Sequence, residues 1–478
     1  MKVPLTPPEF PKLLEKVLQQ GPQRLLEIIT KAGGAAPEGK YRHWDTLRHV
    51  TAPDGLTPEE WWLGVKLARR QLYHRLPLRA KDGKPLKCAL VDPAHRMLHY
   101  ITKNASGAIQ VDEVVTDANT RDTYIVKALI EEAITSSQLE GAATTRAVAK
   151  DMLQRGRKPR DRSEQMIYNN YLAMQFIRSI RDAPLRPSIV LELHRMLTEG
   201  TLDDPSAAGR LRRDDQDIVV EDPFGARLYT PPKASTLEAR LEALCVFANS
   251  HREEDKGAFI HPVIRAIMLH FMTGYDHPFV DGNGRTARAL FYWSLAVQGY
   301  WLSEFISISS ILKKAPARYG EAFLYVETDE NDVTYFILSQ LRVIERAIRT
   351  LHEYLAAETE QIQETESLLR RSPVVSATFN YRQLALLNHA MKHPGFSYTF
   401  RSHRGAHRVA YQTARTDLLA LEQHGLLERL VRGRTFVFVA PDDLKRRVEG
   451  PEGARERTPS HRPTVLDRLH QRFPLGET

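Results

Sequence analysis

Residues 276–285, DHPFVDGNGR, combine a histidine, two carboxylates, an amide, two glycines and an arginine. Helical sequence ends before Pro278 and resumes near Gly284, so the residues between them can turn tightly, with their N–H groups pointing at the next helix. Such a turn binds anions, and the helix dipole strengthens that preference. Arg285 and Arg288 share a face of the next helix, where their guanidiniums can bind successive phosphates. The segment therefore predicts a phosphate-binding loop.

Two further side chains of this loop could act on bound phosphates. His277 can take a proton from an attacking hydroxyl at cellular pH, because the pKa of a histidine is ordinarily about 6.5. Asp281 suits Mg²⁺, since that ion prefers one or two carboxylates together with phosphate oxygens and water. These residues predict a general base and a metal-binding carboxylate beside a nucleotide.

The string HPFVDGNGRTAR (277–288) matches the signature of Fic proteins, His-Pro-Phe-x-(Asp/Glu)-Gly-Asn-Gly-Arg-x-x-Arg, at every specified position. The resemblance extends to the helical sequence from about 121 to 344. It implies a protein adenylyltransferase that transfers AMP from ATP to a hydroxyl of a target protein or of itself. The residues it implies are His277 as general base, Asp281 as Mg²⁺ ligand, Gly282, Asn283 and Gly284 as the phosphate-holding turn, and Arg285 and Arg288 as ligands of the outer phosphates. Gly284 favours AMP transfer, because a branch of the family that transfers phosphate has a bulkier residue there.

Two positions depart from the family pattern. Asp276 precedes the motif histidine where the family usually has an apolar residue, and its carboxylate could raise the pKa of His277 or pair elsewhere. Tyr319 lies where the family often has two tyrosines that contact adenosine, and Gly320 takes the second place. Only Tyr319 is therefore expected to bind the nucleotide.

The segment SSQLEG (136–141) ends a predicted helix over 121–141. Ser136 and Glu140 share a helix face, and Gly141 suits a left-handed C-cap. The same pattern occurs at ordinary helix ends, but here it resembles the inhibitory motif of self-inhibited Fic proteins, (Ser/Thr)-x-x-x-Glu-(Gly/Asn). A carboxylate paired with Arg288 would occupy the guanidinium that should bind the γ-phosphate. Some relatives use this glutamate to position a water that removes AMP, so Glu140 could serve both directions.

The predicted fold is mainly α: a Fic-type helical bundle with an inserted β-hairpin flap, a small N-terminal domain and a C-terminal winged helix-turn-helix. The flap, residues 217–232, has two β-prone runs around a turn, and its open edge could pair with a target segment or simply pack on the core. The predicted helices of the bundle are 121–139, 164–181, 187–198, 235–250, 259–275, 284–297 and 332–356. The predicted domains are an N-terminal helical domain (1–110), a catalytic domain (111–371), the winged helix (372–442) and a flexible tail (443–478).

The C-terminal module has the order helix, helix, helix, β-hairpin. From residue 381 to 439 it contains nine Lys/Arg against three Asp/Glu. DNA contacts are predicted for Tyr411, Gln412 and Arg415 on the third helix and for Arg432 and Arg434 at the hairpin tip. Winged helices also bind proteins or dimerise, so a protein partner and a homodimer remain alternatives.

Composition sets the outer limits. The chain has 478 residues, 42% hydrophobic and 26% charged, with a net charge of +8 that favours an anionic partner. Two cysteines are too few for a disulfide framework or a thiolate metal site. No apolar segment reaches the roughly 18 residues of a membrane span, and the start lacks a signal-peptide pattern, so a cytoplasmic protein is expected. The alternative to an enzyme is an ATP-sensing, DNA-binding transcriptional regulator with little turnover, but such a sensor would not need His277.

Overall fold

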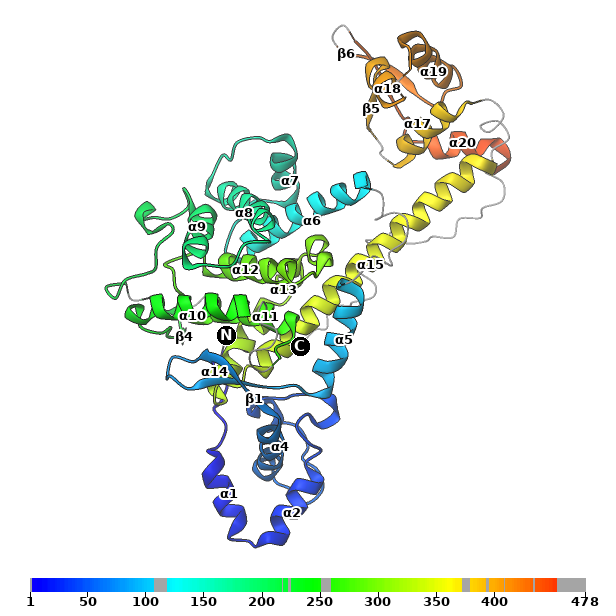
Figure 1. Cartoon of the computed structure of the whole chain (residues 1–478). Helices are drawn as coiled ribbons and strands as arrows, with labels where there is room; N and C mark the ends of the chain where they lie inside the picture. The colour runs from blue at the N-terminus through cyan, green and yellow to red at the C-terminus, as the bar shows by residue number, and fades with distance from the viewer. Residues whose placement is uncertain are drawn as a thin grey trace. The chain divides into compact units, whose positions relative to one another are not determined.

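The computed structural model is mainly helical and divides into two compact units, Met1–His352 and Glu353–Thr478 (Figure 1). Within the described part of the chain, no helix is both long and apolar enough to cross a bilayer. The described residues are 2–106, 118–216, 218–221, 225–250, 259–371, 379–392, 395–407, 409–432 and 435–453.

The N-terminal part combines helices with an antiparallel hairpin. Helix α4 (Pro58–Leu72) begins with a capping box in which Thr57 and Glu60 bond each other's backbone N–H groups. The hairpin of β1 (Tyr73–Arg79) and β2 (Pro85–Ala89) directly follows α4. The other helices here are α1 (Phe10–Leu18), α2 (Pro22–Lys31), α3 (Trp44–Leu47) and α5 (Asp92–Ala105).

The predicted N-terminal helical domain over 1–110 contains an antiparallel hairpin as well as helices. The hairpin was not predicted, although Asp82-Gly83 lies at its turn and Leu76 and Leu78 alternate inward on β1. The compact unit continues to His352 because buried polar side chains of α4 contact the segment after α14 (Pro316–Thr328). Lys66, for example, donates to Asp329 at 2.7 Å.

Helices α11 (Pro262–Asp276) and α12 (Asn283–Val297) form the centre of the helical bundle, and almost every residue of each is buried. They pack against each other, in green in Figure 1, and the loop that was predicted to bind phosphates connects them. Each of the seven predicted helical stretches is present, whereas α7, α13 and α14 were not predicted. The other helices of the bundle are α6 (Ala118–Leu139), α7 (Arg146–Arg155), α8 (Arg162–Ser179), α9 (Pro187–Thr198), α10 (Leu237–Asn249), α13 (Ile308–Leu312) and α15 (Thr334–Arg371).

The predicted flap is a short hairpin. Strand β3 (Val220–Glu221) pairs antiparallel with β4 (Arg227–Tyr229), with Val220 opposite Tyr229. Residues 217 and 222–224 of the flap lie outside the described part. The hairpin interrupts the helical sequence where it was expected.

Among its described residues, the second unit contains four complete helices and a three-stranded antiparallel sheet with the order β5-β7-β6. Leu387, Leu418, Leu421 and Phe438 form the centre of its core. The predicted helices and hairpin are present, and β5 is an addition. Its elements are α17 (Tyr381–Lys392), β5 (Ser397–Tyr398), α18 (Phe400–His407), α19 (Tyr411–Gln423), β6 (Glu428–Arg432), β7 (Thr435–Val439) and α20 (Leu444–Gly453).

Helix α20 occupies the first part of the predicted flexible tail over 443–478. Leu444 and Val448 of this helix are buried in the core of the unit. Residues 454–478 lie outside the described part of the chain, as do Arg434 and the side chain of Arg432, so two of the predicted DNA contacts have no structural description.

Candidate active site

His277 follows the last residue of α11 and has a left-handed backbone conformation, with φ 45° and ψ 57°. This conformation costs a non-glycine residue about 1–3 kcal/mol and persists only where its surroundings hold it. Arg212 does so: its Nε donates to the His277 carbonyl at 2.8 Å, and its backbone N–H donates to the Pro278 carbonyl at 2.9 Å. Arg212 belongs to no recognised sequence motif, so the sequence did not predict that it holds the backbone at His277.

The loop after His277 is clamped by a side chain of its own. Asn283 Oδ1 accepts from the Phe279 N–H at 2.9 Å, and Asn283 Nδ2 donates to the Phe279 carbonyl at 2.8 Å. Gly282 precedes α12 with φ 82°, and a Cβ there would lie 2.7 Å from a methyl carbon of Thr198. Glycine is therefore needed at 282 for its backbone conformation and for space.

His194 of α9 supports the same loop. Its Nδ1 accepts from the Gly209 N–H at 3.0 Å, so Nε2 carries the proton and donates to the Asp281 carbonyl at 2.8 Å. The ring stacks on Phe279 with 3.7 Å between centroids. Burial lowers the pKa of His194 to about 4, which keeps the ring neutral. The only sequence signal for this residue was a histidine in an apolar helix.

Arg285 is fully buried, and part of its guanidinium has no hydrogen-bond partner among the described residues. Nη1 donates to the Leu197 carbonyl at 2.7 Å, whereas Nε and Nη2 make no hydrogen bond. Asp281 Oδ2 is 3.7 Å from Nη2, and burial lowers the pKa of Arg285. Buried donors of this kind fit an anionic ligand.

Asp281 is half-exposed. Its Oδ1 accepts the Gly282 N–H, and its Oδ2 forms the long ion pair with Arg285. No group of three or more His, Cys, Asp or Glu side chains in the described ranges could hold a metal ion. A single carboxylate fits Mg²⁺ where phosphate oxygens supply further ligands.

Glu140 and Arg288 form an ion pair, with Arg288 Nη2 donating to Glu140 Oε1 at 2.8 Å. Ser136 holds the same guanidinium: its hydroxyl accepts from Arg288 Nε at 2.8 Å, and its carbonyl accepts from Nη2 at 3.0 Å. Burial would raise the pKa of Glu140, but the Arg288 charge outweighs burial and lowers that pKa. Gly141 has φ 93°, as a left-handed residue after α6 should.

A pocket of about 220 Å³ brings several predicted residues together. A Cβ on Gly284, in its wall, would lie 2.1 Å from Glu140 Oε1, so the carboxylate lies directly against the start of α12. The Tyr319 hydroxyl is 2.7 Å from His270 Nε2, and burial raises the pKa of Tyr319 to about 12. The predicted site residues that line the pocket are Glu140, His277, Asn283, Gly284, Arg288 and Tyr319, joined by Val220, Leu228 and Tyr229 of the flap. Asp281, Gly282 and Arg285 belong to the same loop but do not line this pocket.

Asp276, the departure from the family pattern, pairs with Arg240 of α10. Arg240 Nε and Nη2 lie 2.8 and 2.6 Å from Asp276 Oδ1. Burial raises the pKa of Asp276 to about 6, while Arg240 acts in the opposite direction. Of the two outcomes left open by the sequence, the carboxylate pairs elsewhere.

Comparison with known proteins points to one family. Residues 184–295 match the model of the Fic/DOC family. A protein adenylyltransferase Fic from Nematostella vectensis is 28% identical over 170 residues, which are 36% of this chain and 34% of that protein. Another from Drosophila willistoni is 31% identical over 131 residues, which are 27% of this chain and 24% of that protein. The chain thus spans about a third or less of the length of these curated relatives.

A likeness to solved structures also exists. The crystal structure of a Fic family protein from Desulfovibrio desulfuricans G20 has 16% sequence identity and a TM-score of 0.47, and the match covers 74% of this chain and 97% of that chain.

Proposed function

We propose, from the Fic domain at residues 184–295, that this chain is a protein adenylyltransferase that uses ATP and Mg²⁺ and is held inactive by Glu140. The observation that carries the proposal is the convergence of His277, Gly284 and Arg288 on one pocket, with Glu140 bound to Arg288.

In the proposed reaction His277 acts as the general base. Its Nδ1 faces the Gly274 carbonyl at 3.4 Å, an acceptor, so the proton belongs on Nδ1 and Nε2 keeps a lone pair. Nε2 takes the proton of a target hydroxyl while the oxygen forms a bond to the α-phosphorus of ATP. The bond from that phosphorus to the bridging oxygen breaks, and pyrophosphate leaves with its electrons.

The other loop residues bind and orient the nucleotide. Arg285 offers the phosphates buried donors that make no hydrogen bond within the described residues, and the backbone around Gly282 and Gly284 would face the phosphates at the start of α12. Asp281 would hold the Mg²⁺ that neutralises charge on the phosphates. Tyr319 and the flap residues would enclose the nucleoside.

The proposed inhibition follows from the pairing of the Arg288 guanidinium with Glu140. While Glu140 binds Arg288, a γ-phosphate would lose this ligand and would meet a carboxylate of like charge. ATP would then bind with its α-phosphorus out of line with the target hydroxyl. The test is mass spectrometry of the Glu140→Gly protein after incubation with ATP and Mg²⁺. The proposal requires peptides that carry AMP on a Ser, Thr or Tyr hydroxyl, and it fails if none is found.

The flap is proposed to dock the target by pairing with an extended segment. Val219→Pro, just before β3, should lower modification of a target about tenfold, because proline removes an N–H and fixes φ. ATP binding, measured by calorimetry, should change less than about twofold. Val219→Ala is the matched control, since it keeps the N–H. Parallel loss of ATP binding and modification would contradict a docking role.

The C-terminal unit supports a winged helix, with DNA as its proposed ligand. Tyr411, Gln412 and Arg415 are exposed on α19, and the helices and strands occur in the order of that fold. This unit also favours the second candidate function, a DNA-binding regulator that senses ATP.

A gel shift with the full-length protein tests the DNA proposal. We expect binding at low salt that weakens as salt rises, because phosphate contacts release counterions. Arg415→Ala should weaken binding about tenfold, the effect of one base contact. Arg446→Ala is the control, since Arg446 is exposed on α20 and pairs with Asp443. No shift at low salt would exclude DNA and leave a protein partner.

A further inference from the structure

Lys81, beside the turn of the β1–β2 hairpin, reaches into the catalytic core. Its ammonium donates to the Thr230 carbonyl at 3.1 Å, forms an ion pair with Glu327 and lies 4.4 Å from the centroid of the Tyr229 ring. Its backbone N–H donates to the Tyr275 hydroxyl at 3.1 Å. One residue of the N-terminal part thus contacts the flap, α11 and α14, and three of these partners line the pocket.

The hairpin has a second link to the site through Arg240. This guanidinium donates to the Arg79 carbonyl at 2.8 Å and to the Ala80 carbonyl at 3.4 Å. It also pairs with Asp276, the residue before His277. The end of β1 therefore helps to place the guanidinium that pairs with Asp276.

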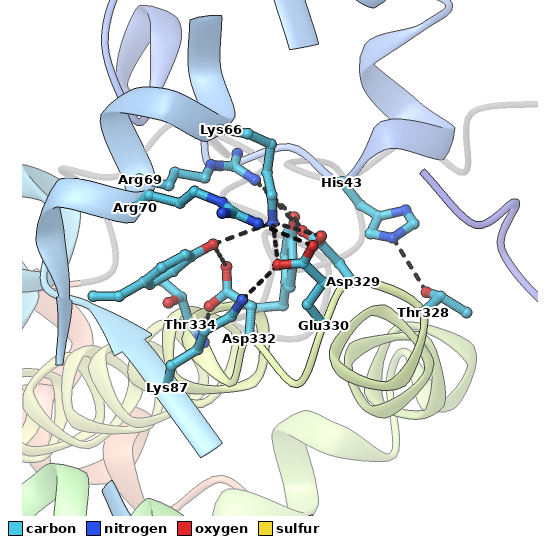
Figure 2. Close-up of polar contacts among 12 residues, drawn as sticks. His43, Lys66, Arg69, Arg70, Lys87, Thr328, Asp329, Glu330, Asp332 and Thr334 are labelled. Atoms are coloured by element: carbon cyan, nitrogen blue, oxygen red, sulfur yellow. Dashed lines mark hydrogen bonds and ion pairs between the residues drawn. The ribbon is translucent and has the colours of Figure 1, made fainter. Parts of the chain in front are cut away.

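A cluster of charged and polar side chains, buried only in part, joins both strands of the hairpin to the turn that follows α14 (Figure 2). Lys66 pairs with Asp329 at 2.7 Å, with side chains only 2% and 1% exposed. Tyr73 of β1 donates to Asp332 at 2.8 Å, and Lys87 of β2 pairs with Glu330 at 2.7 Å. Because the turn is fixed to the strands, the end of α14 and the tip of the hairpin keep a defined separation.

We propose that Lys81 is a positioning residue that sets the gap between the flap and α14, and with it the opening through which a target segment reaches His277. The Thr230 carbonyl and the Glu327 carboxylate are both acceptors, so they face each other favourably only with a donor between them. The Lys81 ammonium supplies that donor, and its positive charge neutralises the Glu327 carboxylate. The proposed role of Lys81 in target access rests on the proposed function. Its proposed contact with the flap as a positioning residue does not depend on that function.

Hydrogen–deuterium exchange of the full-length protein tests whether Lys81 holds the flap in place. Lys81→Met keeps the aliphatic stem and removes the charge, and we expect amides of β3 and β4 to exchange about fivefold faster, the effect of one partly exposed charge-assisted bond. Lys84→Met is the matched control, because Lys84 is on the same turn and pairs only with the neighbouring Asp82 among the described residues. Lys81→Arg should return exchange to within about twofold of the wild type.

Two results would overturn the proposal. One is equal flap exchange in Lys81→Met and Lys84→Met. The other is faster exchange throughout α12 as well as the flap, which would indicate a general loss of stability and not a local hold. Residues 218–221 and 227–230 supply the flap amides for this comparison.

Self-modification, followed by intact mass with ATP and Mg²⁺, tests target access. In the Glu140→Gly background, Lys81→Met should slow AMP transfer about fivefold, whereas Lys84→Met should not. Unchanged transfer in Lys81→Met would overturn the access role even if the flap exchanges faster. If Glu140→Gly itself transfers no AMP, the proposed function fails, and the exchange experiment still decides whether Lys81 holds the flap.

Discussion

Glu140→Gly is expected to raise the rate of AMP transfer by roughly ten- to a hundredfold. The change removes the carboxylate from Arg288 and leaves the guanidinium with its two contacts to Ser136. A charge-assisted hydrogen bond contributes about 1.5–3 kcal/mol, and a γ-phosphate would gain such a bond in the variant. Each 1.4 kcal/mol of transition-state stabilisation corresponds to about tenfold in rate, which gives the range.

The measurement is incorporation of labelled ATP by the wild type and the variant at equal concentrations. Glu140→Gln separates charge from size, because the amide still fills the space against Gly284 but does not repel a phosphate. It should therefore activate less than glycine does. Equal rates of AMP transfer for the wild type and Glu140→Gly would contradict the proposal that Glu140 inhibits the reaction.

The loop and Glu140 could be found in the sequence because each is a local pattern. Residues 277–288 contain the proposed base, the turn and both arginines, and Ser136 and Glu140 lie one helical turn apart. The Glu140–Arg288 pair joins residues far apart in the chain, and only the family resemblance predicted it. The spacing of residues within one helix determines which side chains share a face of that helix. It does not determine which distant part of the chain packs against that face.

The supporting residues could not be predicted for the same reason. The residues that contact the loop or its flanking residues from other elements are Arg212, His194 and Arg240. They belong to no sequence motif, and the sequence around them is typical of an ordinary helix or linker. The hairpin around Asp82-Gly83 had a recognisable turn. Its role depends on Lys81 meeting the flap about 150 residues later, which no sequence spacing indicates.

Helix α4 carries two buried charges that no sequence pattern indicated. The side chains of Lys66 and Arg69 are 2% and 0% exposed. Arg69 donates to the Tyr335 hydroxyl at 2.7 Å, and Lys66 pairs with Asp329. A buried charge needs a partner, so these contacts join α4 to the segment after α14 and to the start of α15.

His277→Ala is expected to lower AMP transfer by roughly a hundred- to ten-thousandfold, the usual contribution of a general base, in the wild-type and Glu140→Gly backgrounds alike. His95→Ala is the control, because His95 is exposed on α5. An alanine variant that kept its rate in the activated background would exclude His277 as the base.

The pH dependence gives an independent test of the same role. A base must be neutral to accept a proton, so the rate should fall as pH decreases through the pKa of His277. Burial is the main cause that lowers this pKa, and the Gly274 carbonyl and Glu140 oppose it. In wild type we therefore expect the acid limb of kcat/KM below the ordinary value of about 6.5. Removing Glu140 takes away a charge that favours the imidazolium, so in Glu140→Gly the limb should move to still lower pH. A limb that moved upward in the variant would mean that the titrating group is not His277.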